Sequence, residues 1–133
     1  MSDQRLAKWH EVVAQGNTEL LTELLHPEME FHSPTFWGAK EGGHVAHFIL
    51  CQVLDIFEDF EYHREWIDGN NFALEFSCKV EDKNIKGIDL IRWNDEGQII
   101  HFEVMVRPLN GLARLADLMT QRFVEAGFIK SYT

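Results

Sequence analysis

The chain has 133 residues, 45% of them hydrophobic, which is the length of one domain with a core of its own. Its 22 acidic and 12 basic side chains give a formal net charge of -10, which repels phosphate backbones and anionic membrane surfaces. We therefore expect a single domain over residues 1–133 and neither nucleic acid nor a membrane as a partner.

Targeting signals and cysteine motifs are not evident in the sequence. No run of residues approaches the roughly 18 apolar positions that span a bilayer, and the first ten residues, MSDQRLAKWH, lack the features of a signal peptide. We expect a cytoplasmic protein. Cys51 and Cys78 show no CxxC or CxxH spacing, so we interpret them as buried thiols that pack as small hydrophobic groups.

The first half of the chain is predicted to be mainly helical. Ser2 or Asp3 can cap a first helix whose apolar residues recur at helical spacing until Gly16. A short second helix, TELLTELL, ends before Pro27, because the residue before a proline favours extended geometry. A short strand, MEFHSP, then a loop, TFWGAKEGG, and a third helix, HVAHFILCQVLD, follow in order.

From Phe57 onward the hydrophobic period changes to two, which is typical of strands. The predicted strands are FEYHREWI, FALEFSCKV, IKGIDLIRW and IIHFEVMVR, joined by polar turns. These four strands predict an antiparallel meander. A last helix follows Asn110-Gly111 with the sequence LARLADLMTQRFVEAG, so the order of elements predicts an α+β domain.

Asp89 is an acid in a strand whose alternate positions are otherwise apolar or glycine. If residues 94–97 form the turn and Trp93 faces Gln98, the register places Asp89 opposite Phe102, on the apolar side of the sheet. An isolated charge there is costly, so we expect Asp89 to stay neutral, to be paired, or to lie in a cavity. Two interpretations remain: a structural Asp held by a backbone donor or a Trp indole, and an acid in a binding pocket.

The order of elements, together with EMEFHSPTFWGAKEGG and GIDLIRWNDEGQII, resembles the nuclear-transport-factor-2-like superfamily, which includes ketosteroid isomerases and SnoaL-like polyketide cyclases. The resemblance covers nearly the whole chain. It implies a cone-shaped, curved antiparallel sheet, or half barrel, closed by the N-terminal helices around an apolar cavity, with a C-terminal helix. It also implies a homodimer joined through the outer sheet face, which suits the row His101, Glu103, Met105 and Arg107.

The resemblance also implies roles for individual residues. The isomerase pattern Asp-x-x-Arg-aromatic-Asn is matched by residues 89–94, so Asp89 takes the place of an acid that apolar surroundings keep protonated in ketosteroid isomerases. Trp9 takes the place of the family's tyrosine on the first helix. Ser33, before Pro34, replaces the proton-shuttling aspartate, and a serine cannot remove a proton from carbon without a partner base.

Histidines are the candidates for the missing base, and aromatic residues are the candidates for the cavity wall. His32 or His10 can supply a base if the register or the helix rotation differs slightly from expectation, although alternation points His32 away from Ser33. His44 and His47 lack a third ligand at a recognisable spacing, so we expect no metal site. The expected ligand-binding aromatic residues are Trp9, Phe31, Trp37, Tyr62, Trp66, Phe76 and Phe102.

Two hypotheses follow. In the first, the chain is a small enzyme that acts without a cofactor on a hydrophobic, oxygen-bearing molecule by isomerisation, cyclisation, dehydration or hydrolysis, with Asp89, Ser33 and His32 as the catalytic candidates. In the second, it is a noncatalytic ligand-binding or dimeric interaction domain, because Ser33 stands where the family has a base.

Overall fold

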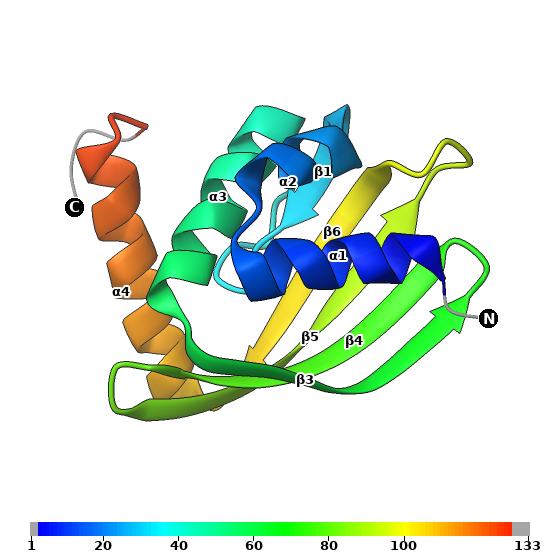
Figure 1. Cartoon of the computed structure of the whole chain (residues 1–133). Coiled ribbons are helices and arrows are strands. Elements are labelled where there is room, and N and C mark those ends of the chain that lie inside the picture. Colours follow the sequence, from blue (N-terminus) through cyan, green and yellow to red (C-terminus); the bar gives the residue numbers. More distant parts are fainter. Residues whose placement is uncertain (1–2, 129–133) are drawn as a thin grey trace.

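The computed structural model describes residues 3–128, in which four helices pack against an open six-stranded sheet (Figure 1). The elements are α1 (Gln4–Gln15), α2 (Thr18–Leu24), β1 (Leu25–His32), β2 (Lys40–Glu41), α3 (Gly43–Ile56), β3 (Glu58–Asp68), β4 (Asn71–Val80), β5 (Lys83–Trp93), β6 (Ile99–Arg107) and α4 (Leu109–Glu125). This arrangement confirms the α+β class, with a curved sheet covered by the N-terminal helices and with a C-terminal helix.

Helix α1 begins and ends where the sequence predicts. Asp3 is the N-cap, and its carboxylate accepts a 2.9 Å hydrogen bond from the backbone N–H of Arg5. Ser2, the other predicted cap, lies outside the described residues. Gly16 ends the helix with φ 64°, a left-handed conformation that glycine adopts without steric cost. Between these two ends, Trp9 and Val12 lie on the buried face of α1, which packs against the sheet.

The strand order across the sheet is β2-β1-β6-β5-β4-β3. The meander from β3 to β6 is antiparallel, as predicted, but β1 joins the far side of β6 in parallel and carries β2 on its other edge. The sheet is therefore mixed and not wholly antiparallel. β1 and β6 are far apart in the sequence, with α3 and most of the meander between them, but they lie side by side in the sheet. Neither β2 nor the parallel pairing was expected from the sequence.

The predicted register of β5 against β6 is wrong, although the predicted face of Asp89 is right. Trp93 pairs with Ile99 and not with Gln98, and an irregularity between Arg92 and Trp93 adds a second one-residue shift. Asp89 therefore lies opposite Val104. Each one-residue shift exchanges the two faces of a strand, so two shifts restore the original face.

The main core lies between the concave face of the sheet and the helices α1, α2 and α3 (Figure 1). A second cluster lies at the end of the sheet where α4 packs, and it contains Leu115 and Cys78. Cys51 and Cys78 are both free thiols, and burial raises the pKa of Cys78 to about 12, as suits a packing residue. No helix within residues 3–128 is long and apolar enough to span a membrane.

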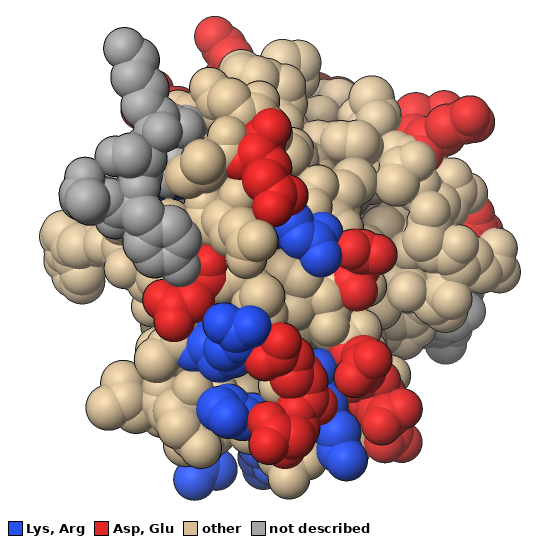
Figure 2. Space-filling model, turned by 90° about the vertical axis from the view of Figure 1, so that its left-hand side faces the viewer, with Lys and Arg blue, Asp and Glu red and all other residues tan. Residues whose placement is uncertain are grey.

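Ion pairs join α4 to the rest of the chain. The guanidinium of Arg122 lies 2.8 Å from the carboxylate of Asp55 on α3, and Arg114 makes two hydrogen bonds, of 2.6 and 2.9 Å, to Glu81 beside β4. Figure 2 shows acidic and basic side chains side by side on this surface of the molecule. These contacts, together with Leu115 in the second cluster, hold α4 against the end of the curved sheet.

Candidate functional site

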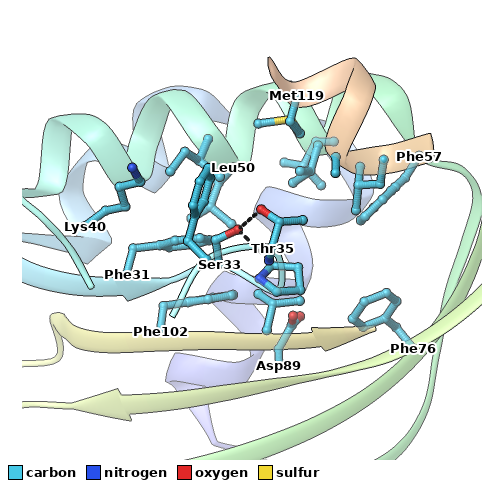
Figure 3. Close-up of a pocket in the computed structure, with 18 of the residues that line it drawn as sticks. Phe31, Ser33, Thr35, Lys40, Leu50, Phe57, Phe76, Asp89, Phe102 and Met119 are labelled. Carbon is cyan, nitrogen blue, oxygen red and sulfur yellow. Dashed lines mark hydrogen bonds between the residues drawn. The ribbon is translucent and has the colours of Figure 1, made fainter. Parts of the chain in front are cut away.

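A cavity lies between the concave face of the sheet and the helices α1, α3 and α4 (Figure 3). Its walls are mostly aliphatic and aromatic, and the space available to water-sized molecules is about 70 Å³, which is room for more than one water molecule. Few polar side chains interrupt this lining: Ser33, Thr35, Lys40, Tyr62, Asp89 and Thr120. A ligand that fills this cavity must therefore be largely apolar, with polar groups at a few positions.

Asp89 projects from β5 into this cavity. Its neighbours across the sheet are Leu74 on β4 and Val104 on β6, and only 6% of its surface is exposed. Figure 3 shows its carboxyl group between the rings of Phe76 and Phe102, below Thr35. The predicted position of Asp89, on the apolar face and in a cavity, is confirmed.

A chain of two hydrogen bonds runs from α1 through β3 to Asp89. The indole Nε1 of Trp9 donates to the hydroxyl oxygen of Tyr62 at 2.8 Å, and this hydroxyl donates to Oδ2 of Asp89 at 2.7 Å. Because an indole can only donate, the Tyr62 hydroxyl is the acceptor in the first bond, and it donates in the second bond when Asp89 is ionised. Among residues 3–128 only Tyr62 hydrogen-bonds to this carboxyl group, so its second oxygen is left for whatever occupies the cavity.

The surroundings of Asp89 change its acidity strongly. Burial raises its pKa from 3.8 to about 7, because a charged carboxylate is poorly solvated there, and the hydrogen bond from Tyr62 lowers the pKa by a smaller amount. Burial, followed by the charge of Asp89, raises the pKa of Tyr62 well above 10. Asp89 is thus the acid in this pair that changes its protonation state near neutral pH.

Gly87 explains how an aromatic wall can lie directly beside Asp89 on the sheet. A Cβ atom at this position would lie 2.5 Å from the carbonyl oxygen of Met105 and 2.5 Å from Cζ of Phe76, both far inside normal contact distance. The absence of a side chain lets the ring of Phe76 lie across β5. Gly87 therefore provides the space on one side of Asp89, while Ile91 fills the other side with a buried hydrocarbon side chain.

Ser33 reaches the cavity, as expected, but no histidine of residues 3–128 lines the cavity with it. Its hydroxyl lies 2.9 Å from that of Thr35 and accepts a 3.2 Å hydrogen bond from the backbone N–H of Thr35. His32 points to the opposite face of β1, where its ring lies 4.6 Å from that of His101. His32 therefore does not line this cavity with Ser33, because alternation along the strand points the two side chains to opposite faces of the sheet.

His10, the other histidine considered as a base, is also engaged elsewhere. Its Nε2 lies 2.6 Å from a carboxylate oxygen of Glu65, and its ring stacks on Tyr62 with the ring centroids 5.6 Å apart. It does not belong to the cavity lining. Of the titratable side chains in that lining, Asp89 is the one with an acidity suited to proton transfer at neutral pH.

Five of the seven predicted aromatic residues line the cavity, and two do not. Those in the lining are Trp9, Phe31, Tyr62, Phe76 and Phe102. Trp66 does not line the cavity because an irregularity between Tyr62 and Glu65 reverses the faces of β3, which leaves Trp66 half-exposed on the outer surface. Trp37 does not line it because Trp37 projects from the loop after β1 and is 98% exposed.

Several lining residues were not expected from the sequence. The loop after β1 and the strand β2 contribute Phe36 and Lys40, the start of the meander contributes Phe57 and Phe60, and α4 contributes Met119. Figure 3 shows Lys40, Phe57 and Met119 among the residues around the cavity. In the sequence of α4, Met119 recurs at helical spacing with Leu112 and Leu115, which predicts a face that packs against a partner element. Nothing in the local sequence indicated that the partner would be the cavity end of the sheet.

Solved structures similar to this chain include two with substantial sequence identity. A steroid delta-isomerase from Pseudomonas aeruginosa is 42% identical, with a TM-score of 0.88 and coverage of 95% of this chain and 93% of that chain. An uncharacterized protein with a cystatin-like fold from Silicibacter pomeroyi is 36% identical, with a TM-score of 0.87 and coverage of 95% and 90%.

More distant similarities concern the fold alone. An NTF2-like protein of unknown function from Cytophaga hutchinsonii is 19% identical, with a TM-score of 0.61 and coverage of 78% of this chain and 88% of that chain. No protein-family model and no curated protein matches this chain.

Proposed function

This chain belongs to the nuclear-transport-factor-2-like superfamily, and from that premise we propose that it is a small enzyme acting without a cofactor on a hydrophobic, oxygen-bearing molecule. The observation that carries this proposal is the carboxyl group of Asp89, which is buried in an apolar cavity with a pKa of about 7 and one oxygen free of protein partners.

Asp89 suits general acid–base catalysis because both of its protonation states are populated near neutral pH. A catalytic group works best when its pKa lies close to the operating pH. In the ionised form, the oxygen facing the cavity accepts a proton from the ligand, while Tyr62 stabilises the other oxygen. In the protonated form, Asp89 donates that proton back. One carboxyl group can thus both remove and return a proton.

This arrangement supports isomerisation or dehydration of a molecule with a carbonyl group. Ionised Asp89 removes a proton from the carbon next to the carbonyl, and the electrons of that C–H bond move into an enolate. Protonated Asp89 then delivers the proton either to another carbon of the same molecule or to a departing hydroxyl group, which leaves as water. The hydroxyls of Ser33 and Thr35 lie in the lining to receive the polar end of the ligand, since the N–H of Trp9 is already bound to Tyr62.

The similarity to a steroid delta-isomerase makes ketones the first substrates to consider, and the cavity volume of about 70 Å³ favours smaller planar ketones over fused-ring ones. The aromatic walls of the cavity suit flat, apolar molecules. A second candidate function is binding without turnover, and the observation that favours it is Ser33, whose hydroxyl interacts with Thr35 and has no base beside it.

The two candidates differ in their response to one substitution. We would mix the protein with steroid ketones and with smaller planar ketones and phenols, and follow binding by calorimetry and product formation by NMR. For the enzyme, Asp89→Asn lowers kcat/KM by about 10²-fold or more, the usual contribution of a general acid–base group, while binding persists. Asp68→Asn, an exposed acid at the end of β3, is the control and leaves turnover unchanged.

The outcomes of this experiment are distinct. Turnover that survives in the Asp89→Asn variant would contradict the role of Asp89. Binding by both proteins without product from either would favour the noncatalytic function.

We also propose that two chains form a homodimer through the outer face of the sheet. This face presents Trp66 and Met105, which are 50% and 49% exposed. Between them lie paired charges: the carboxylate of Glu75 is 2.6 Å from Arg64 and 3.3 Å from Lys86. An apolar area with its charges already paired is suited to burial against a second copy.

A further inference from the structure

The outer face carries a second group of titratable side chains, where β1 and β6 run parallel. Glu30 and His32 are two residues apart on β1, and His101 and Glu103 are two apart on β6, so all four side chains point to the same face. In the register, Glu30 lies beside His101 and His32 lies beside Glu103. The parallel pairing thus brings together two histidines and two acids from distant parts of the chain.

Two of the three distances in this group are close to those between neighbouring ligands of a metal ion. Oε2 of Glu30 lies 3.5 Å from Nε2 of His32 and 3.7 Å from Nδ1 of His101, and the ligand atoms of these three residues all lie within 4.8 Å of one another. Bonds of roughly 2.0–2.2 Å from zinc to nitrogen and oxygen place neighbouring ligands of a tetrahedral site about 3.4 Å apart. The three side chains are therefore close to a coordinating arrangement.

Glu103 completes the arrangement by fixing the orientation of His101. Its carboxylate lies 3.3 Å from Nε2 of His101, on the side of the ring opposite the Nδ1 that faces Glu30. A histidine that binds a metal usually donates its other ring N–H to a carboxylate, which leaves the coordinating nitrogen unprotonated. Glu103 is placed to accept that hydrogen bond and so to direct Nδ1 toward the ion.

The surrounding charges and exposure also suit a cation. Glu41 on β2 lies beside Glu30, which adds negative charge, while Arg92 on β5 lies beside His101 and opposes it in part. In the single chain the side chains of His32 and His101 are each 27% exposed and that of Glu30 is 52% exposed, so an ion can reach them from solvent before two chains associate.

We propose that Glu30, His32 and His101 bind a divalent transition-metal ion, with Zn²⁺ the best match to two imidazoles and one carboxylate. Three protein ligands leave a fourth position for water. The ion fastens β1 to β6, the parallel pair of the sheet, just before the chain turns at Ser33 toward the cavity. The site lies on the face of the sheet opposite Asp89, so it is independent of the proposed acid–base chemistry.

No motif in the sequence indicated this site, because its ligands belong to two strands about 70 residues apart in the numbering. Metal motifs are recognised by the spacing of ligands along one element. Here the spacing that matters is the one between paired strands, and the parallel pairing of β1 with β6 was not predicted.

The test uses the whole chain without a histidine tag, treated with a chelator and then titrated with Zn²⁺ by calorimetry and with Co²⁺ by visible absorption. We expect one ion per chain and a Co²⁺ spectrum typical of four-coordinate geometry. His32→Gln and His101→Gln each abolish saturable binding. Glu103→Gln, which affects only the orientation of His101, weakens binding by about 10–100-fold. His63→Gln, an exposed histidine on β3 that contacts Ser77, is the matched control and binds as the unmodified chain does.

A second measurement does not depend on the variants being folded. In the unmodified chain, Co²⁺ is expected to shift the NMR signals of the His32 and His101 rings and to leave that of His63 unchanged. No saturable binding by the unmodified chain, equal affinity in the His101→Gln variant, or one ion for every two chains would overturn the proposal.

Discussion

At the scale of single residues, the acidity of Asp89 is the balance of two opposing effects. Burial favours the neutral form and the hydrogen bond from Tyr62 favours the ionised form, and burial is the larger effect, which leaves the pKa at about 7. The position of Gly87 two residues before Asp89 contributes indirectly, because it lets Phe76 cover this part of the strand. The acid–base property therefore depends on neighbours from β3 and β4 as well as on Asp89.

The raised pKa predicts a specific dependence of stability on pH. Between about pH 4 and pH 7 the folded chain keeps a proton on Asp89 that the unfolded chain has lost, since the ordinary pKa is 3.8. This contribution to stability is complete below pH 4 and is lost as the pH rises through 7, by about 4 kcal/mol in all. Asn cannot ionise, so the Asp89→Asn variant gains stability relative to the unmodified chain over this range.

The measurement is urea unfolding of both proteins between pH 4 and pH 8. The difference between their free energies of unfolding isolates Asp89 from the other carboxylates. A difference that stays constant across this range would contradict the raised pKa.

At the scale of elements, the packing of β5 between β4 and β6 depends on the close approach permitted at Gly87. We expect Gly87→Ala to lower the free energy of unfolding by about 1–3 kcal/mol, the usual cost of overpacking, because the new methyl group meets the carbonyl of Met105 and the ring of Phe76. Chemical denaturation measures this change.

The matched control for Gly87 is Gly38, on the loop after β1. Nothing lies within 4 Å of a Cβ atom at Gly38. Gly38→Ala should therefore change stability by less than about 0.5 kcal/mol. Equal losses of stability in the two variants would show that contacts of the new methyl group do not cause the loss at Gly87.

The success of prediction from sequence also differs between elements. Alternation placed Asp89 on the correct face of β5 because two single-residue shifts cancel, whereas one irregularity in β3 was enough to misplace Trp66. Such irregularities are set by curvature of the whole sheet and leave little local signal. The hydrogen-bond partner of Asp89 is not predicted for a related reason: the sequence predicts Tyr62 as part of the cavity wall, but its hydroxyl is held toward Asp89 through the indole of Trp9 on the distant helix α1.

At the scale of the whole molecule, one sheet serves different purposes on its two faces. The concave face holds the cavity, and the outer face holds the proposed metal ligands at its β1–β6 end and the exposed Trp66 and Met105. Fold and cavity followed from hydrophobic periodicity and from the resemblance of the sequence to a family. The outer face did not, because its features arise from strand pairing across long stretches of chain.

The proposed homodimer predicts the mass of the species in solution. Sedimentation at micromolar concentration should show twice the mass of one chain, and Met105→Lys should shift the population toward the single chain, because a charge is costly to bury in an apolar contact. A chelator is added so that metal ions do not affect association. Ala113→Lys, an exposed position on α4, is the control and leaves the mass unchanged. A single-chain species for the unmodified protein would rule out the dimer.

The indole of Trp9, which can only donate, is the last group in the series of hydrogen bonds from Asp89 through Tyr62. An indole nitrogen neither accepts a proton nor releases one under ordinary conditions. No proton relay toward solvent can therefore operate through Trp9. In the proposed isomerisation, a proton that Asp89 takes from a bound ligand is therefore expected to return to that ligand before it exchanges with bulk water.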